Sequence, residues 1–116
     1  MSSGGGAERR VATRVSSRLH PSVPGQVNFV AGPIEGSGTI LDVSVDGAHV
    51  FQPSDQLEPG TKVDMYFLQG STGRRLHALA EVVRRTEFGF AVRFLRVERE
   101  LTTLVLNAVN DEQSAQ

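Results

Sequence analysis

Residues 38–51, GTILDVSVDGAHVF, contain the clearest structural pattern in the chain. Apolar and polar side chains alternate over 41–45, with the two-residue period of a β-strand that buries one face. Asp46-Gly47 is a turn signal because both residue types tolerate positive φ. The apolar run at 48–51 then predicts an antiparallel return strand, so the stretch as a whole predicts a β-hairpin.

Short strand-like runs recur on both sides of this hairpin. Further strands are predicted at 27–30, 62–68, 76–84 and 88–94. A loop at 53–60 contains proline and glycine, and a polar turn occupies 69–73. Counting both arms of the hairpin, at 38–45 and 48–51, this makes six strands.

After these strands the apolar period becomes helical. Apolar residues recur three and four positions apart along one face of a helix predicted at 97–109: Val97, Leu101, Leu104, Val105 and Ala108. Six short strands followed by one helix predict a mainly β protein, a six-stranded antiparallel β-barrel with a C-terminal α-helix.

The length of 116 residues and the mass of 12.5 kDa suit one domain. We expect that domain to span residues 8–110. Within it, an arginine-rich N-terminal arm is followed by the barrel and the helix, and the two ends of the chain are polar. The expected divisions are a flexible tail at 1–7, the arm at 8–18, the barrel at 26–96, the helix at 97–109 and a polar tail at 111–116.

Composition excludes several classes of protein. The formal charge of −1 disfavours a general nucleic-acid binder. Without cysteine there is no disulfide, no thiolate zinc site and no cysteine nucleophile. No apolar run approaches the roughly 18 residues of a membrane span, and the N-terminus lacks the apolar core of a signal peptide. These features predict a soluble intracellular domain without a membrane span.

No catalytic template fits the sequence. His20, His49 and His77 are widely separated and do not form a metal-ligand spacing. There is no G-x-S-x-G nucleophile elbow, and the stretch GPIEGSG at 32–38 lacks the lysine of a P-loop. We therefore expect no catalytic residue, no metal and no cofactor, and a protein that is not an enzyme.

Arginine is concentrated near the N-terminus. The stretch ERRVATR at 8–14 holds Arg10 and Arg14 in an R-x-x-x-R spacing, and Arg14 and Arg18 form a second such pair. The spacing alone is unspecific, because eleven of the twelve basic residues in the chain are arginine and chance pairs are expected. Arginine nevertheless has the planar, forked donor that suits phosphates and guanine edges.

The predicted hairpin carries a second polar pattern, Asp42-x-Ser44-x-x-Gly47. Strand alternation would place Asp42 and Ser44 on one face, about 7 Å apart. A carboxylate beside a hydroxyl suits the adjacent donors of a guanine Watson–Crick edge. Gly47 lacks a side chain where a ligand or another backbone needs close approach. Taken alone, the pattern also fits an outward polar face that ends in an ordinary turn.

Together, and in this order, the two patterns resemble the signature of the PilZ domain family, bacterial receptors for cyclic di-GMP. Arg10 and Arg14 match its R-x-x-x-R element, and Asp42, Ser44 and Gly47 match its D/N-x-S-x-x-G element. The resemblance runs from residue 8 to about 108, although the segment after Arg14 is long for the family. The preceding ERR favours Arg10 and Arg14 over the alternative pair with Arg18.

The resemblance implies a function. Arg10 and Arg14 would bind phosphates and guanines, Asp42 would accept hydrogen bonds from a guanine, and Ser44 would bond a guanine or phosphate while Gly47 leaves room for a base. Arg9 looks like the family variant associated with an intercalated ligand dimer. The ligand would clamp the arm onto the barrel, and the protein would act in the bacterial cytoplasm as an adaptor that signals in trans to an unidentified downstream protein.

Two other readings remain open on the sequence. One is a PilZ-like protein-interaction module without nucleotide affinity, for example associated with pili or motility. The other is a small barrel for single-stranded nucleic acid, which the absence of tryptophan and the single tyrosine, Tyr66, disfavour.

Overall fold

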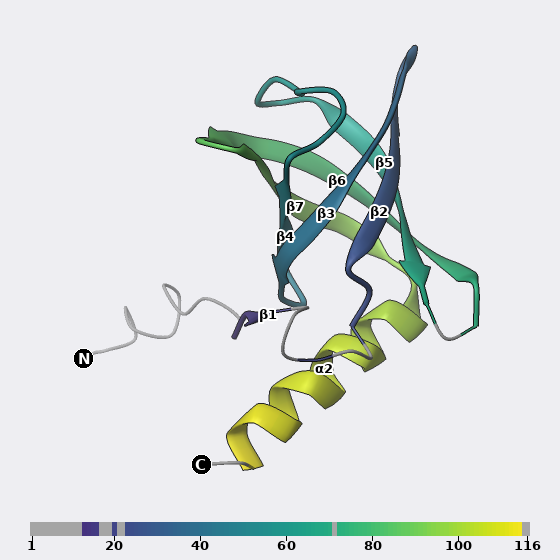
Figure 1. Cartoon of the computed structure of the whole chain (residues 1–116), viewed down its shortest axis with the longest axis vertical. Helices are drawn as coiled ribbons and strands as arrows, with labels where there is room; N and C mark the ends of the chain where they lie inside the picture. The colour runs from purple at the N-terminus through teal and green to yellow at the C-terminus, as the bar shows by residue number, and fades with distance from the viewer. Residues whose placement is uncertain (1–12, 17–19, 21–22, 71, 115–116) are drawn as a thin grey trace.

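In the part of the chain that the structure describes, six strands close into an antiparallel barrel, and a helix lies across one end of it (Figure 1). The computed structural model describes residues 13–16, 20, 23–70 and 72–114. The strands are β1 Val15–Ser16, β2 Gln26–Ala31, β3 Ile34–Val43, β4 Gly47–Phe51, β5 Lys62–Gln69, β6 Arg74–Thr86 and β7 Gly89–Val97, and the helix is α2 Arg99–Ser114. The barrel order is β3-β2-β5-β6-β7-β4, with β4 pairing back onto β3, so the predicted fold class is confirmed.

The glycine-rich stretch at 32–38 forms a tight turn and a strand. Gly32 has a φ of 61° in the turn between β2 and β3, and Ala31 pairs with Ile34 across it. Gly36 lies opposite Phe29, and a Cβ at Gly36 would be 2.6 Å from Cζ of that ring. The glycine therefore makes room for an aromatic core residue, and β3 begins four residues before the predicted strand.

The hairpin between β3 and β4 differs in detail from the prediction. A β-bulge interrupts the ladder between Ile40 and Asp42, so the simple alternation over 41–45 does not hold. β3 ends at Val43, and Ser44 donates its N–H to the Gly47 carbonyl at 2.8 Å. The connection is therefore the three-residue segment 44–46. The expected two-residue turn at 46–47 is wrong, since neither residue has positive φ.

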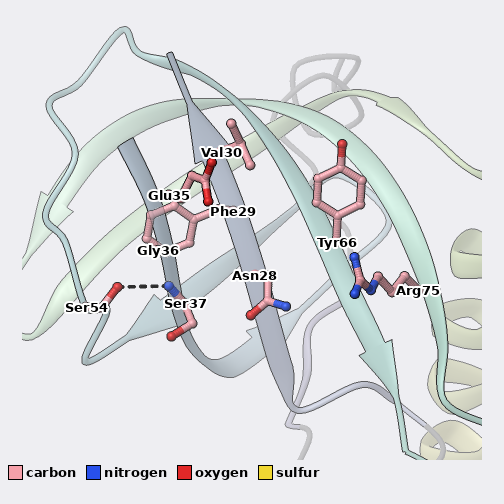
Figure 2. A pocket seen from close by; sticks show the side chains of 9 residues that line it. All are labelled: Asn28, Phe29, Val30, Glu35, Gly36, Ser37, Ser54, Tyr66 and Arg75. Atoms are coloured by element: carbon pink, nitrogen blue, oxygen red, sulfur yellow. Dashed lines mark hydrogen bonds between the residues drawn. The ribbon is translucent and has the colours of Figure 1, made fainter. Parts of the chain in front are cut away.

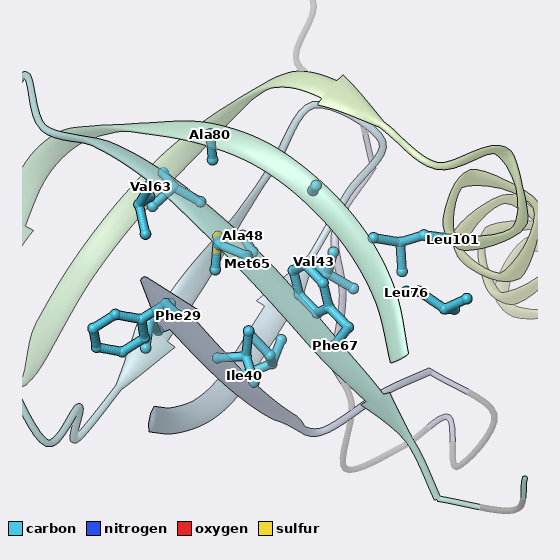
Figure 3. Packing of buried hydrophobic residues seen from close by; sticks show 14 of the residues in the cluster. Phe29, Ile40, Val43, Ala48, Val63, Met65, Phe67, Leu76, Ala80 and Leu101 are labelled. Atoms are coloured by element: carbon cyan, nitrogen blue, oxygen red, sulfur yellow. The ribbon is translucent and has the colours of Figure 1, made fainter. Parts of the chain in front are cut away.

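The barrel interior is filled by aliphatic and aromatic side chains from every long strand (Figure 3). Phe29 and Phe90 meet edge to face with ring centroids 5.6 Å apart, and Phe67 and Phe94 do so at 6.0 Å. Such pairs add to the hydrophobic gain from burying large rings. The core thus depends on four phenylalanines although the chain is poor in aromatic residues.

The helix begins and ends later than its apolar periodicity predicted. Val97 pairs with Ala78 as the last residue of β7, so it belongs to the sheet. Glu98 separates the two elements: its carboxylate accepts the His77 N–H at 2.9 Å, and its carbonyl accepts the Leu101 N–H at 3.0 Å. The helix continues to Ser114, so 111–114, expected to be tail, are helical. No helix in the described ranges has both the length and the apolar character needed to cross a membrane.

The helix is held by its apolar face. Leu101, Val105 and Ala108 are buried in the same cluster as the barrel core, whereas Leu106 on the other face is 47% exposed. In Figure 3 the Leu101 side chain points from α2 toward the barrel. The barrel end and the helix therefore form one continuous core.

Replacing Leu101 by alanine should lower the free energy of unfolding by about 2–5 kcal/mol, because it leaves a cavity between helix and barrel. Leu106→Ala is the matched control on the same helix and should change stability by about 0.5 kcal/mol or less. Urea denaturation followed by circular dichroism measures both variants. Equal stability of the two would show that the helix does not contribute to the core.

Candidate functional site

The first strand brings a residue of the N-terminal segment onto the barrel. β1 pairs with the end of β3, with Val15 opposite Val43 and Ser16 opposite Asp42. Val15 is 1% exposed and anchors this short ladder in the core. Because successive side chains of a strand point to opposite sides, Arg14, just before Val15, remains on the outside.

Arg14 and Asp42 are in direct contact. The Arg14 Nη1 donates a hydrogen bond to Asp42 Oδ1 at 2.7 Å, with the two side chains 46% and 27% exposed. Residues 28 positions apart in the chain thus form one charged pair on the outer surface of the barrel. The pair combines a guanidinium that can bind phosphate or guanine with a carboxylate that can accept guanine donors.

His49 lies on the other side of Asp42. It pairs with Asp42 in the β3–β4 ladder, and its Nδ1 is 3.9 Å from Asp42 Oδ2. Its Nε2 is 3.1 Å from the Thr86 hydroxyl on β6. In the sequence, His49 is considered only as a metal ligand, and its spacing from the other histidines does not favour that role. The one sequence feature that pointed to His49 was its position on the predicted return strand, two residues after Gly47. Its proximity to Asp42 became clear only from the pairing of β3 with β4.

Ser44 and Gly47 shape the turn beside this pair. Ser44 is only 2% exposed, and its Oγ accepts the Asp46 N–H at 3.1 Å. It therefore does not share the exposed face of Asp42 as strand alternation predicted. A Cβ on Gly47 would be 2.1 Å from the Val92 carbonyl oxygen, so the close approach at this glycine is that of the β7 backbone.

Of the six predicted site residues, the structure places four in one neighbourhood: Arg14 and Asp42 in contact, and Ser44 and Gly47 in the adjoining turn. Arg9 and Arg10 lie outside the described residues. Within the described ranges, no group of three or more histidine and acidic side chains is placed to hold a metal ion.

The barrel also has an open hollow of about 420 Å³ on the outer side of β2, β3 and β5 (Figure 2). It contains none of the predicted site residues. Among its lining residues Arg75 is the only cation, and the carboxylate of Glu35 would repel a phosphate, so the hollow is a poor match for a ligand with two phosphates. The lining residues are Asn28, Phe29, Val30, Glu35, Gly36, Ser37, Ser54, Tyr66 and Arg75.

Comparison with known proteins identifies the family of the chain. The profile of the PilZ domain matches residues 8–110. The chain belongs to the PilZ domain family. PilZ domains are binding modules rather than enzymes and generally bind cyclic di-GMP. No curated protein matches the chain significantly.

A solved structure shares the fold. The crystal structure of the PilZ domain of CeSA from a cellulose-synthesizing bacterium superposes with a TM-score of 0.59 and 17% sequence identity. The match covers 87% of this chain and 99% of that domain. At this identity the similarity concerns the fold of the PilZ domain.

Replacing Gly47 by alanine should lower the free energy of unfolding by about 1–3 kcal/mol, since the new methyl group would meet the Val92 carbonyl. Gly70→Ala is the control, because a Cβ there meets nothing within 4 Å and its φ is not positive. Thermal unfolding compares the two. A Gly47→Ala variant as stable as Gly70→Ala would show that the glycine is not required by the backbone.

Proposed function

We propose that this PilZ domain is a cyclic di-GMP receptor whose binding site is centred on Arg14 and Asp42. The observation that supports it best is their direct contact, which joins the two halves of the family signature on one surface. In the proposal Arg9 and Arg10 add to this site from the preceding segment of the arm.

Each group has a chemical task. The Asp42 carboxylate accepts hydrogen bonds from N1–H and N2–H₂ of a guanine, which present two parallel donors. Arg10 and Arg14 fork onto phosphate oxygens or stack on guanine faces. For this, Arg14 must release Asp42. An exposed ion pair of this kind contributes only about 0–1 kcal/mol, so the exchange is inexpensive.

Ser44 and Gly47 act mainly through the turn. The buried Ser44 hydroxyl holds the Asp46 N–H, and Gly47 lets β4 approach β7. Together they hold the end of β3 and therefore the direction of Asp42. A direct bond from Ser44 to the ligand, as expected from the family, would require this turn to open.

Ligand binding then provides a signal. A nucleotide that contacts both the arm and the barrel fixes one on the other and presents a new surface to a downstream protein in the bacterial cytoplasm. Part of the contact energy is used in ordering the arm, which lowers the affinity. Signalling in trans, through protein contact, completes the proposal.

Isothermal titration of cyclic di-GMP should show micromolar or tighter binding to the wild-type protein. Arg10→Ala, Arg14→Ala and Asp42→Ala should each weaken it by about tenfold or more, because each removes a charged hydrogen bond. The stoichiometry measured in the same titration tests Arg9, since an intercalated dimer gives two ligands per protein.

The control is Arg74→Ala. Arg74 is also an exposed, ion-paired arginine, but its partners are Glu98 and Glu100 near the start of α2. The Arg74→Ala variant should bind cyclic di-GMP with the same affinity as the wild-type protein. If the wild-type protein shows no binding in the titration, the receptor proposal is wrong. The protein would then be a PilZ module that acts through protein contact alone.

Hydrogen exchange of the arm should slow when cyclic di-GMP is added. We expect amides in 8–18 to gain protection, because bound ligand holds the arm against β3, while amides of α2 change little. Mass spectrometry of peptides from both regions measures the difference. Binding without protection in the arm would contradict the clamp but leave the receptor intact.

A further inference from the structure

A row of outward residues continues from the candidate site across three neighbouring strands. Asp42 of β3 is opposite His49 of β4, His49 is opposite Ala91 of β7, and Ala91 is opposite Arg84 of β6. Directly paired residues lie on the same face of a sheet. The row therefore places Arg84 on the outer side of the barrel, as it does Asp42, although the two are 42 positions apart in sequence.

Two β-bulges occur at the ends of this row. One lies between Ile40 and Asp42 in β3, and the other lies between Val82 and Arg84 in β6. A bulge changes the direction of the side chain that follows it and is often found beside a binding site. Each end of the row is thus a charged residue placed immediately after an irregularity in its strand.

Arg84 differs from the arginines around it in its contacts. Arg85 bonds Glu58 at 3.3 Å, and Arg93 bonds Glu81 at 2.8 Å. The exposed Arg84 side chain forms no ion pair or hydrogen bond with any residue of the described ranges. Its five donors are therefore available to a ligand.

The two residues between the ends of the row differ in exposure. Ala91 contributes only a methyl group on the outer side of the sheet and is 2% exposed, so its neighbours cover it. His49 is 25% exposed on its side chain and is fixed by Thr86 on one nitrogen, so it offers a flat ring with a defined orientation. A partly exposed flat ring is a suitable stacking partner for a planar base.

We propose that the cyclic di-GMP site extends along this row, with His49 and Arg84 as further ligand contacts. The inference rests on the proposed function. Measured along the curved sheet, three strand spacings separate the backbones of Asp42 and Arg84 by about 14 Å, more than a single base spans. A dinucleotide with two guanines and two phosphates has groups for both ends. In this arrangement Arg84 binds the guanine or phosphate that is too far from Asp42 to contact it.

The test is titration of cyclic di-GMP into Arg84→Ala, with Arg85→Ala as the matched control. Arg85 is adjacent and equally charged, but its ladder partner Phe90 is in the core and its guanidinium bonds Glu58. Arg84→Ala should weaken binding about tenfold, and Arg85→Ala should stay within about twofold. Both side chains are on the surface, so both variants should fold.

The proposed contact of His49 with the ligand is tested with His77 as the control, because His77 also lies on a strand and faces a carboxylate. His77 Nε2 is 2.8 Å from Asp64, on β5 and away from the row. In the wild-type protein, the ring signals of His49 in NMR spectra should shift when cyclic di-GMP is added, while those of His77 should not. His49→Ala should weaken binding, and His77→Ala should not.

The possible failures are distinguishable. If the wild-type protein binds and Arg84→Ala binds equally well, Arg84 is not part of the site and the row ends before β6. If the His49 ring signals do not move on saturation, His49 is not a contact. A wild-type protein that does not bind at all removes the proposed function and this inference with it.

Discussion

The close approach of β4 to β7 is the constraint on which the rest of the structure depends. β4 has only five residues, yet it closes the barrel by pairing with β3 on one side and β7 on the other. Glycines mark both ends of its ladder with β7, and a Cβ on either one, Gly47 or Gly89, would lie about 2 Å from a carbonyl oxygen of the facing strand. Closure at this point sets the order in which Asp42, His49 and Arg84 follow one another across the surface.

Much of the fold could be predicted because local patterns agree with it. Strand alternation, turn residues and the change to a helical period identified the six barrel strands and the helix. The features of the fold that the sequence did not predict depend on contacts between residues that are distant in the chain. β1 is two residues long and exists through its pairing with β3, and Gly36 belongs to a strand because Phe29 fills the space beside it. The bulge at Leu41 has no signal in the alternation, which looks regular through that position.

The residues of the candidate site could be proposed from local sequence patterns, but their contacts could not. Arg14 and Asp42 carry signature chemistry, so the sequence could propose them together, but only the β1–β3 ladder explains how they meet. Ser44 and Gly47 also match the signature. In the structure the buried hydroxyl of Ser44 and the missing side chain of Gly47 serve the turn and the β7 backbone. A signature residue can thus be required for the backbone geometry that presents its neighbour.

The contact between Arg14 and Asp42 combines a fixed anchor with an exchangeable bond. Val15 is 1% exposed and ties the N-terminal segment to the barrel through hydrophobic burial. Next to it, the exposed pair holds the two charges that the proposed receptor would offer to a nucleotide. Because water and salt screen such a pair, a ligand that offers phosphates to the arginine and guanine donors to the carboxylate can replace it at small cost. In the proposed receptor, the buried Val15 therefore keeps the N-terminal segment close to Asp42, while the weak ion pair leaves Asp42 accessible to a ligand.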